Sequence, residues 1–254
     1  MRTGRSPVMR APDVDPEEFP PLPPTGRRVT RERDVRLSDA TSRGRARLDA
    51  LACYLQDVAT DDVDDAGLVG AWVLRRVVLA LGDPPLYRDV VELTTFCSGT
   101  GSRFAERRTT LTVAGRVAVE AVALWVYVDE AGRPARLRDW FFDCYGAAAR
   151  GRQVRSRLRH PPPAPDATVR SWPLRVSDID VLDHVNNAAS WAAVEDELGR
   201  HHAERGLARA EMEYRRPVDL DEAIELRTST RADGLACWLT RGDDVCTSAR
   251  VWFA

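Results

Sequence analysis

The sequence predicts an α+β fold in which one module, a long central helix wrapped by an antiparallel sheet, occurs twice in tandem. The first observation is an internal repeat: residues 35–39 (Val-Arg-Leu-Ser-Asp) align with residues 174–178 (Leu-Arg-Val-Ser-Asp). In the same alignment, the helical patterns that follow these two segments also coincide. The second observation is that two later segments, 89–93 and 124–126, align in the same order with 222–226 and 251–253. Each copy therefore predicts a strand, a long helix and then several strands.

The first half is expected to follow a tail without structure. Residues 1–28 contain seven prolines and few large apolar groups, a composition that cannot support a core, so we expect them to be disordered. Apolar residues at helical spacing predict a helix over 46–59, and the acidic run at 61–65 is expected to end it in a solvated loop. Strands are expected where β-branched and aromatic residues lie between Gly and Pro breaks, over 73–81, 90–97, 107–113 and 117–127. These elements would form a domain over 29–146.

The second half is expected over 168–254, after a linker at 147–167 that is rich in Arg, Ala and Pro. Its helix is predicted over 187–205, with Trp191, Val194 and Leu198 on the face that packs into the core. Its strands are predicted over 209–215, 223–232, 237–239 and 245–253.

Composition sets the outer bounds. A chain of 254 residues with 44% hydrophobic and 30% charged residues can bury a substantial core. No apolar run approaches the roughly 18 residues that cross a bilayer, and the N-terminus lacks the apolar core of a signal peptide, so we expect a cytoplasmic protein without membrane contact. The net charge of −2 predicts no general affinity for nucleic acid, and the five cysteines show no spacing typical of a metal site.

Residues 177–187 form the candidate active site, because they place carboxylates, an imidazole and two carboxamides just ahead of the second helix. A helix start presents unpaired N–H groups and a partial positive charge, which could polarise a carbonyl while Asp180 or His184 handles a water molecule. A simpler hypothesis is that Asp183, Asn186 and Asn187 only cap the helix.

The two copies differ where this chemistry would lie. Thr41 aligns with Asp180 and Arg45 aligns with His184, so the first half lacks both candidate catalytic groups. We therefore expect catalysis only in the second half.

A long helix wrapped by an antiparallel sheet, twice in tandem, is the pattern of a double hotdog, and the chain resembles the acyl-ACP thioesterase family of bacteria and plant plastids over about residues 29–254. The resemblance rests on 178–187 (Asp-Ile-Asp-Val-Leu-Asp-His-Val-Asn-Asn), on 213–216 (Glu-Tyr-Arg-Arg) and on 87–93 (Tyr-Arg-Asp-Val-Val-Glu-Leu). It implies hydrolysis of fatty acyl thioesters carried on the phosphopantetheine arm of acyl carrier protein, a reaction of fatty acid biosynthesis that needs no cofactor and no metal.

The resemblance also implies roles for single residues. Asp180 and His184 match the catalytic Asp and His of the family, and backbone N–H groups near 185–187 would hold the oxyanion. Leu182 stands where the family has Asn, and Pro217-Val218 stands where plant members have Glu-Cys. We expect Asn187 or Asp183 to supply the polar contact that Leu182 lacks.

Substrate binding is expected in the first half, where Trp72, Leu74 and Val90 would shape an acyl tunnel, and Asn186 is also expected to bind substrate. The simpler hypothesis for Trp72, Leu74 and Val90, and the more frequent role of such residues, is that they only pack in the core. The arginines of the linker, at positions 150, 152, 155, 157 and 159, could dock the acidic surface of a carrier protein. An acyl-CoA thioesterase or other hotdog hydrolase and a non-catalytic acyl-binding protein are the alternatives, and the protein would be a monomer or a homodimer.

Overall fold

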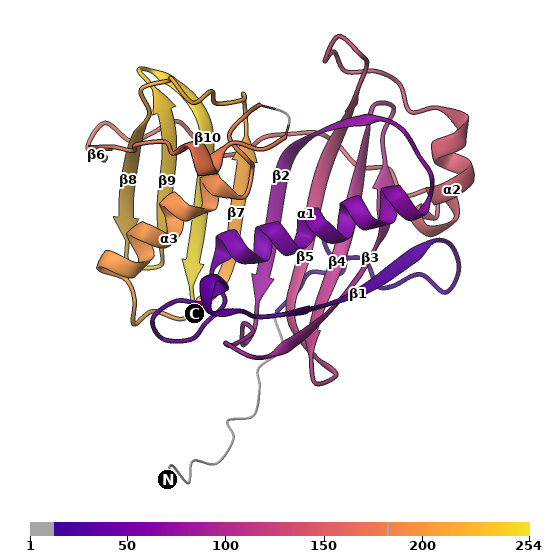
Figure 1. Ribbon diagram of the computed structural model, residues 1–254, viewed down its shortest axis with the longest axis horizontal. Coiled ribbons are helices and arrows are strands. Elements are labelled where there is room, and N and C mark those ends of the chain that lie inside the picture. Colours follow the sequence, from indigo (N-terminus) through magenta and orange to yellow (C-terminus); the bar gives the residue numbers. More distant parts are fainter. Residues whose placement is uncertain (1–12, 182) are drawn as a thin grey trace, which may run out of the picture.

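The computed structural model describes residues 13–181 and 183–254, which form one ten-stranded antiparallel sheet with two long helices across the same face (Figure 1). The strand order is β1-β3-β4-β5-β2-β7-β10-β9-β8-β6. In the first half the elements are β1 (Arg28–Asp34), η1 (Leu37–Asp39), α1 (Leu48–Asp65), β2 (Ala71–Leu81), β3 (Val90–Thr100), β4 (Phe104–Val113), β5 (Arg116–Val128) and α2 (Asp139–Ala149). In the second half they are β6 (Thr168–Ser171), η2 (Val176–Asp178), α3 (Ala189–His201), β7 (Leu207–Tyr214), β8 (Glu225–Arg231), β9 (Gly234–Arg241) and β10 (Asp244–Phe253).

The strand order confirms the duplication. It is symmetric about the pairing of β2 with β7: outward from this seam, β5 corresponds to β10, β4 to β9, β3 to β8 and β1 to β6. Helix α1 crosses the sheet of the first half, and α3 crosses the sheet of the second half (Figure 1). The predicted double hotdog is therefore the observed fold.

The core lies between these helices and the sheet. On α1, Leu48, Leu51, Leu55 and Val58 are buried, which is the spacing of one helical face. On α3, Trp191, Val194 and Leu198 are buried as predicted. Trp191 is fully buried, and its Nε1–H donates to the hydroxyl of Tyr214 on β7 at 3.0 Å, so its one polar group is satisfied.

Helix α1 corrects the prediction for the acidic run. It continues through 61–65 as far as Asp65, so this run is helical rather than a loop. Asp62 is 1% exposed because it forms ion pairs with Arg27 (Nε to Oδ1, 2.6 Å) and with Arg107 on β4 (Nη1 to Oδ2, 2.5 Å). These partners lie far from Asp62 in the sequence, and they satisfy the charge that burial would otherwise penalise.

The strand expected ahead of the first helix is β1, which pairs with β3 at the edge of the sheet. Helix α2 was not predicted; it packs on β3 at the outer end of the first half. Helix α3 begins at Ala189 and ends at His201, inside the predicted range of 187–205. Among the described helices, none is both long and apolar enough to cross a membrane.

Part of the predicted tail is packed against the outer face of the sheet. Residues 1–12 lie outside the described residues. Phe19 is only 2% exposed and clusters with Val78, Ala80 and Val122, and Glu18 pairs with Arg209 at 2.8 Å. The expectation of disorder is therefore wrong for this part of the segment.

The linker is also held on that outer face. His160 is 7% exposed, and its backbone N–H donates to Glu213 at 3.1 Å. Arg215 donates to the carbonyl of His160 at 2.7 Å. The linker therefore covers the strand β7 next to the seam between the two halves.

Candidate active site

The candidate site begins with a tight turn that precedes α3. The backbone N–H of Asp183 donates to the carbonyl of Asp180 (3.0 Å), and the N–H of Asp180 donates to the carbonyl of His184 (2.9 Å). Asp183 has φ of 64°, a left-handed conformation that Asp tolerates better than most residues. Its side chain is exposed, so the role of Asp183 is to adopt the backbone conformation that the turn requires.

The same turn occurs in the first half, where it carries different side chains. The N–H of Thr41 donates to the carbonyl of Arg45 at 2.7 Å, which repeats the bond between Asp180 and His184. The N–H of Arg47 donates to Asp39, as the N–H of Asn186 donates to Asp178, both at 2.8 Å. The alignment of Thr41 with Asp180 and of Arg45 with His184 is therefore a structural equivalence.

A cavity of about 540 Å³ runs along the C-terminal half of α1 and reaches this turn. Asp180, Asn186 and Asn187 line it from the second half, and α1 contributes residues from Gln56 to Asp64. At 1.5 Å per residue, this stretch of helix spans about 12 Å, which gives an extended chain room to lie along it.

Aromatic side chains of the remaining wall come from β2, β5 and α2, and Glu106 and Arg107 of β4 also line it. The ring centroid of Phe141 lies 5.5 Å from that of Trp72 and 6.1 Å from that of Trp140, and all three residues line the cavity. Burial raises the pKa of Tyr145, which also lines the cavity, to about 12, so its phenol stays protonated at neutral pH. Burial raises the pKa of the Cys97 thiol in this wall to about 11, so it is not a thiolate nucleophile.

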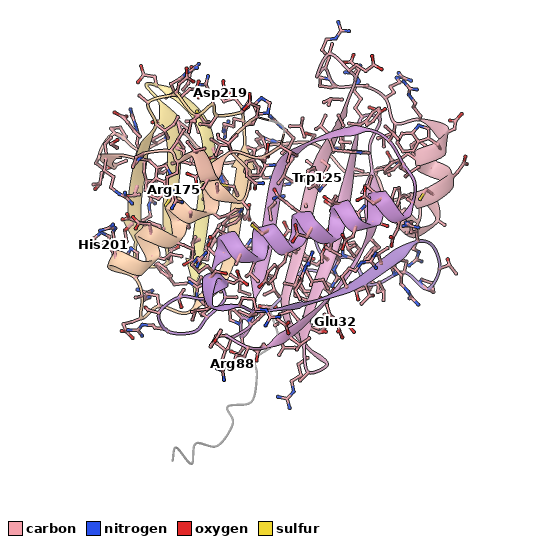
Figure 2. The ribbon with its side chains drawn as sticks, viewed as in Figure 1. Glu32, Arg88, Trp125, Arg175, His201 and Asp219 are labelled. Atoms are coloured by element: carbon pink, nitrogen blue, oxygen red, sulfur yellow. The ribbon has the colours of Figure 1, made fainter. Side chains whose placement is uncertain are left out.

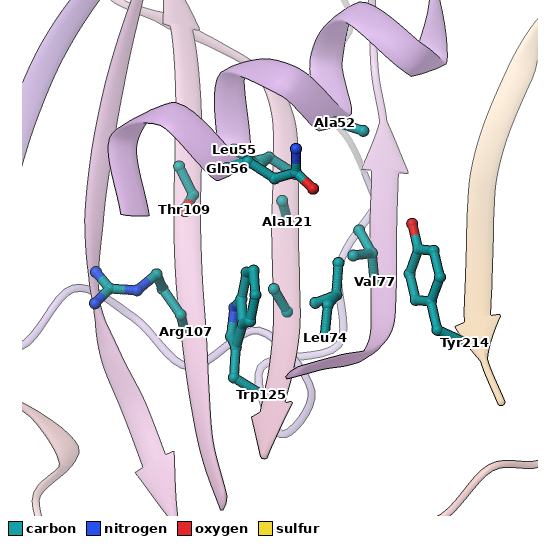
Figure 3. Close-up of a pocket in the computed structure, with 11 residues that line it drawn as sticks. Ala52, Leu55, Gln56, Leu74, Val77, Arg107, Thr109, Ala121, Trp125 and Tyr214 are labelled. Atoms are coloured by element: carbon teal, nitrogen blue, oxygen red, sulfur yellow. The ribbon is translucent and has the colours of Figure 1, made fainter. Parts of the chain in front are cut away.

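Beside this cavity, a small void of about 10 Å³ lies under α1. Figure 3 shows Gln56 reaching from α1 toward the space above Trp125 and Leu74, with Arg107 beside them. Figure 2 labels Trp125, which belongs to β5 of the first half. Gln56, Trp125 and Arg107 line both spaces.

The predicted site residues divide into two groups. Asp180, Asn186, Asn187 and Trp72 line the cavity, and Leu74 lines the small void beside it. His184 is exposed and is not among the cavity residues. Val90 is 50% exposed at the start of β3 and is also outside the lining. Leu182 lies outside the described residues.

The carboxamides ahead of α3 have distinct contacts. Asn186 Oδ1 accepts the N–H of Ala188 at 2.8 Å, so the capping hypothesis is correct for Asn186. The N–H groups of Val185 and Asn186 are occupied, since they donate to the carbonyls of Val218 (3.0 Å) and Asp178 (2.8 Å). They are therefore not available to an oxyanion. Within the described residues, the N–H of Asn187 has no such bond.

Two further buried side chains fix the backbone of Asn187. Its carbonyl accepts a hydrogen bond from the hydroxyl of Tyr214 at 3.1 Å, and that hydroxyl accepts one from Trp191. The start of α3 is thus tied to β7 at the seam. Sequence reasoning placed Trp191 in the core and Tyr214 in a motif of the resemblance, but it missed both contacts because they join residues that lie far apart in the sequence.

The linker arginines that were predicted to dock a carrier protein fall into two groups: one bonds within the protein and the others are exposed. Arg152 bonds within the protein, donating to the carbonyls of Ser98 (3.2 Å) and Glu17 (2.8 Å) and pairing with Glu106. The arginines at 150, 155, 157 and 159 are exposed.

The fold is that of a double hotdog protein. Residues 26–145 match the acyl-ACP thioesterase N-terminal domain family, and residues 163–248 match the acyl-ACP thioesterase C-terminal domain family. The chain therefore belongs to the acyl-ACP thioesterase family, whose members are thioester hydrolases.

The chain is also similar to other proteins in sequence and in fold. An uncharacterized protein of Mycobacterium tuberculosis is 27% identical over 216 residues, which are 84% of this chain and 86% of that protein. The 12:0-ACP thioesterase of Umbellularia californica superposes with a TM-score of 0.77 at 19% identity, covering 89% of this chain and 97% of that one. An acyl-ACP thioesterase of Bacteroides thetaiotaomicron gives 0.77 at 18% identity, over 89% and 98%. At these identities, the structural matches show the fold alone.

Proposed function

We propose that this protein hydrolyses fatty acyl thioesters of acyl carrier protein, with the thioester at Asp180 and the acyl chain in the cavity along α1. The observation that supports this most strongly is that Asp180, beside the start of α3, lines a cavity most of whose other residues are apolar or aromatic; Asp64, Glu106 and Arg107 are the other charged residues that line it. A mostly apolar space with a carboxylate at the end near α3 suits a substrate with one polar reactive group and a long apolar tail.

In the proposed reaction, Asp180 accepts a proton from water while the water oxygen attacks the thioester carbon. The tetrahedral intermediate then collapses, the C–S bond breaks, and the proton passes from Asp180 to the leaving thiolate. Direct attack by the Asp180 carboxylate is the alternative route; it would form an anhydride that water then opens. Among the described residues of the turn and the helix start, the N–H of Asn187 makes no bond to a backbone carbonyl. In either route it would donate to the oxyanion, a contribution of about 3 kcal/mol.

Of the two predicted catalytic residues, Asp180 and His184, the role of His184 has less support. Its side chain is exposed, and Asp180 alone of the two lines the cavity. We therefore assign the proton transfer to Asp180 and treat an orienting role of His184 as a separate question for mutation.

Hydrolysis assays with matched substrates test the proposed function. The same acyl group is presented on acyl carrier protein and on CoA, across several chain lengths, to the wild type and to Asp180→Asn. We expect turnover of the carrier-bound substrate to exceed that of the CoA ester, and Asp180→Asn to lose about 10²-fold or more in kcat. Preference for CoA would indicate an acyl-CoA thioesterase, and binding of both without turnover would indicate an acyl-binding protein.

A further inference from the structure

The side chain of Gln56 joins the two halves at the candidate site. Its Nε2 donates to Asn186 Oδ1 at 3.0 Å, so a residue of α1 contacts the residue that caps α3. Gln56 is half-buried and lines both the large cavity and the small void. The residues predicted to carry the chemistry lie wholly in the second half, and Gln56 is not among them.

The pseudo-symmetry of the molecule gives this position a counterpart. The interval that relates Thr41 to Asp180 and Arg45 to His184 also relates Gln56 to Glu195 on α3. Each of these two side chains reaches across the seam to the helix start of the other half.

In the first half, the counterpart site is closed by an ion pair. Glu195 pairs with Arg45 through two bonds of 2.9 Å and accepts the N–H of Leu48 at 2.6 Å. Leu48 corresponds to Asn187, so in the first half the carboxylate accepts the N–H at the helix start. In the second half the neutral amide of Gln56 stands at the equivalent position and bonds to Asn186 instead. Among the described residues, the N–H of Asn187 makes no bond to a backbone carbonyl, and we assign it to the ligand.

The hydrogen bonds determine how the two amides are oriented. The N–H of Ala188 can only donate, so the atom of Asn186 that faces it must be the oxygen. Gln56 must then present its nitrogen to that same oxygen. Asn186 lines the cavity, and with Oδ1 held by two donors, Nδ2 is the atom of its amide that we assign to a substrate.

We infer that Gln56 is a positioning residue for thioester hydrolysis: it fixes the Asn186 amide so that Nδ2 donates to the thioester oxygen beside the N–H of Asn187. The first half thus contributes to the active site as well as to the acyl cavity. This inference rests on the proposed function.

The test replaces Gln56 by Met, which has similar length and no donor, and by Glu, which has an acceptor in place of the donor. We expect Gln56→Met to lower kcat about tenfold while KM changes less than threefold and the melting temperature is retained. Gln153, the other glutamine of the chain, is exposed, and Gln153→Met is the matched control with wild-type kinetics.

The pH profile of Gln56→Glu separates positioning from packing. In this variant, an ionised carboxylate would face Asn186 Oδ1 without a proton to donate, whereas the protonated acid can donate. The ratio of its kcat to that of the wild type should therefore rise as pH falls toward the ordinary range of a Glu carboxyl, about 4.3.

The possible outcomes are distinguishable from a failure of the proposed function. If the wild type hydrolyses acyl-carrier substrate and Asp180→Asn does not, while Gln56→Met keeps wild-type kcat, the inference is wrong and the proposed function stands. A Gln56→Glu ratio that stays flat with pH would also overturn the inference. If Asp180→Asn keeps full activity, the proposed function fails first.

Discussion

Removing the carboxylate of Glu195 should destabilise the protein without impairing its chemistry. Glu195 is 7% exposed at its side chain, and Arg45 is 24% exposed, so Glu195→Ala leaves a mostly buried guanidinium without its partner. Breaking a buried pair in this way costs about 3–5 kcal/mol, and the partial exposure of Arg45 favours the lower end of this range. The lost hydrogen bond to the N–H of Leu48 adds about 1 kcal/mol. We therefore expect a loss of about 4 kcal/mol.

Urea denaturation followed by circular dichroism measures this loss, and hydrolysis assays below the transition measure the chemistry. The melting temperature should fall by roughly 10 °C, since each kcal/mol corresponds to about 2–4 °C for a domain of this size. Glu204→Ala removes the carboxylate of an exposed pair, with 77% exposure, and should change stability by less than about 0.5 kcal/mol.

Two outcomes would show that this expectation is wrong: a Glu195→Ala variant that unfolds like the wild type, or one whose kcat falls while it remains folded. The first would mean that the ion pair does not hold the halves together. The second would mean that the first-half site takes part in catalysis.

Three other predictions concern the site, the seam and the cavity. His184→Ala should lower kcat less than tenfold, since the side chain of His184 is exposed. A loss as large as that of Asp180→Asn would instead show that His184 is a catalytic residue. Burial alone would raise the pKa of Glu211, but the His160 ring and nearby guanidinium groups outweigh it and hold this pKa well below its ordinary 4.5. The free energy of unfolding should therefore fall as pH drops below about 4.5, less steeply in Glu211→Gln, and parallel curves would contradict this. Trp140→Ala opens the aromatic wall, so hydrolysis should shift toward longer acyl chains, and an unchanged profile across chain lengths would place the acyl end elsewhere.

Much of the fold could be predicted because the chain encodes it twice. The repeated segments before each helix, and the later segments that align in order, identify the equivalent elements of the two halves without any knowledge of their contacts. The structure then shows the same equivalence in the strand order and in the hydrogen bonds of the two turns.

The missed elements have specific reasons. Helix α2 carries Phe141, Tyr145, Ala148 and Ala149 on its buried face, a helical spacing that is present in the sequence but interrupted by other aromatic residues. The acidic run wrongly predicted the end of α1, because the arginines that pair with the buried Asp62 lie far from it in the sequence. Long-range ion pairs of this kind leave no local signal.

The candidate site was partly predictable for a similar reason. Asp180, Asn186 and Asn187 follow one another closely, so a local motif revealed them. Gln56 comes from another helix and enters only through the fold. A signal nevertheless existed, because the repeat alignment places Gln56 opposite Glu195.

The most decisive experiment is a crystal structure with an acyl carrier protein analogue, using an amide in place of the thioester so that the complex survives. We predict the amide carbon beside Asp180, its oxygen within hydrogen-bonding distance of the Asn187 N–H, and the acyl chain along α1 between Gln56 and Asp64. An acyl chain bound outside this cavity, or a carbonyl remote from Asp180, would show that the site is assigned wrongly.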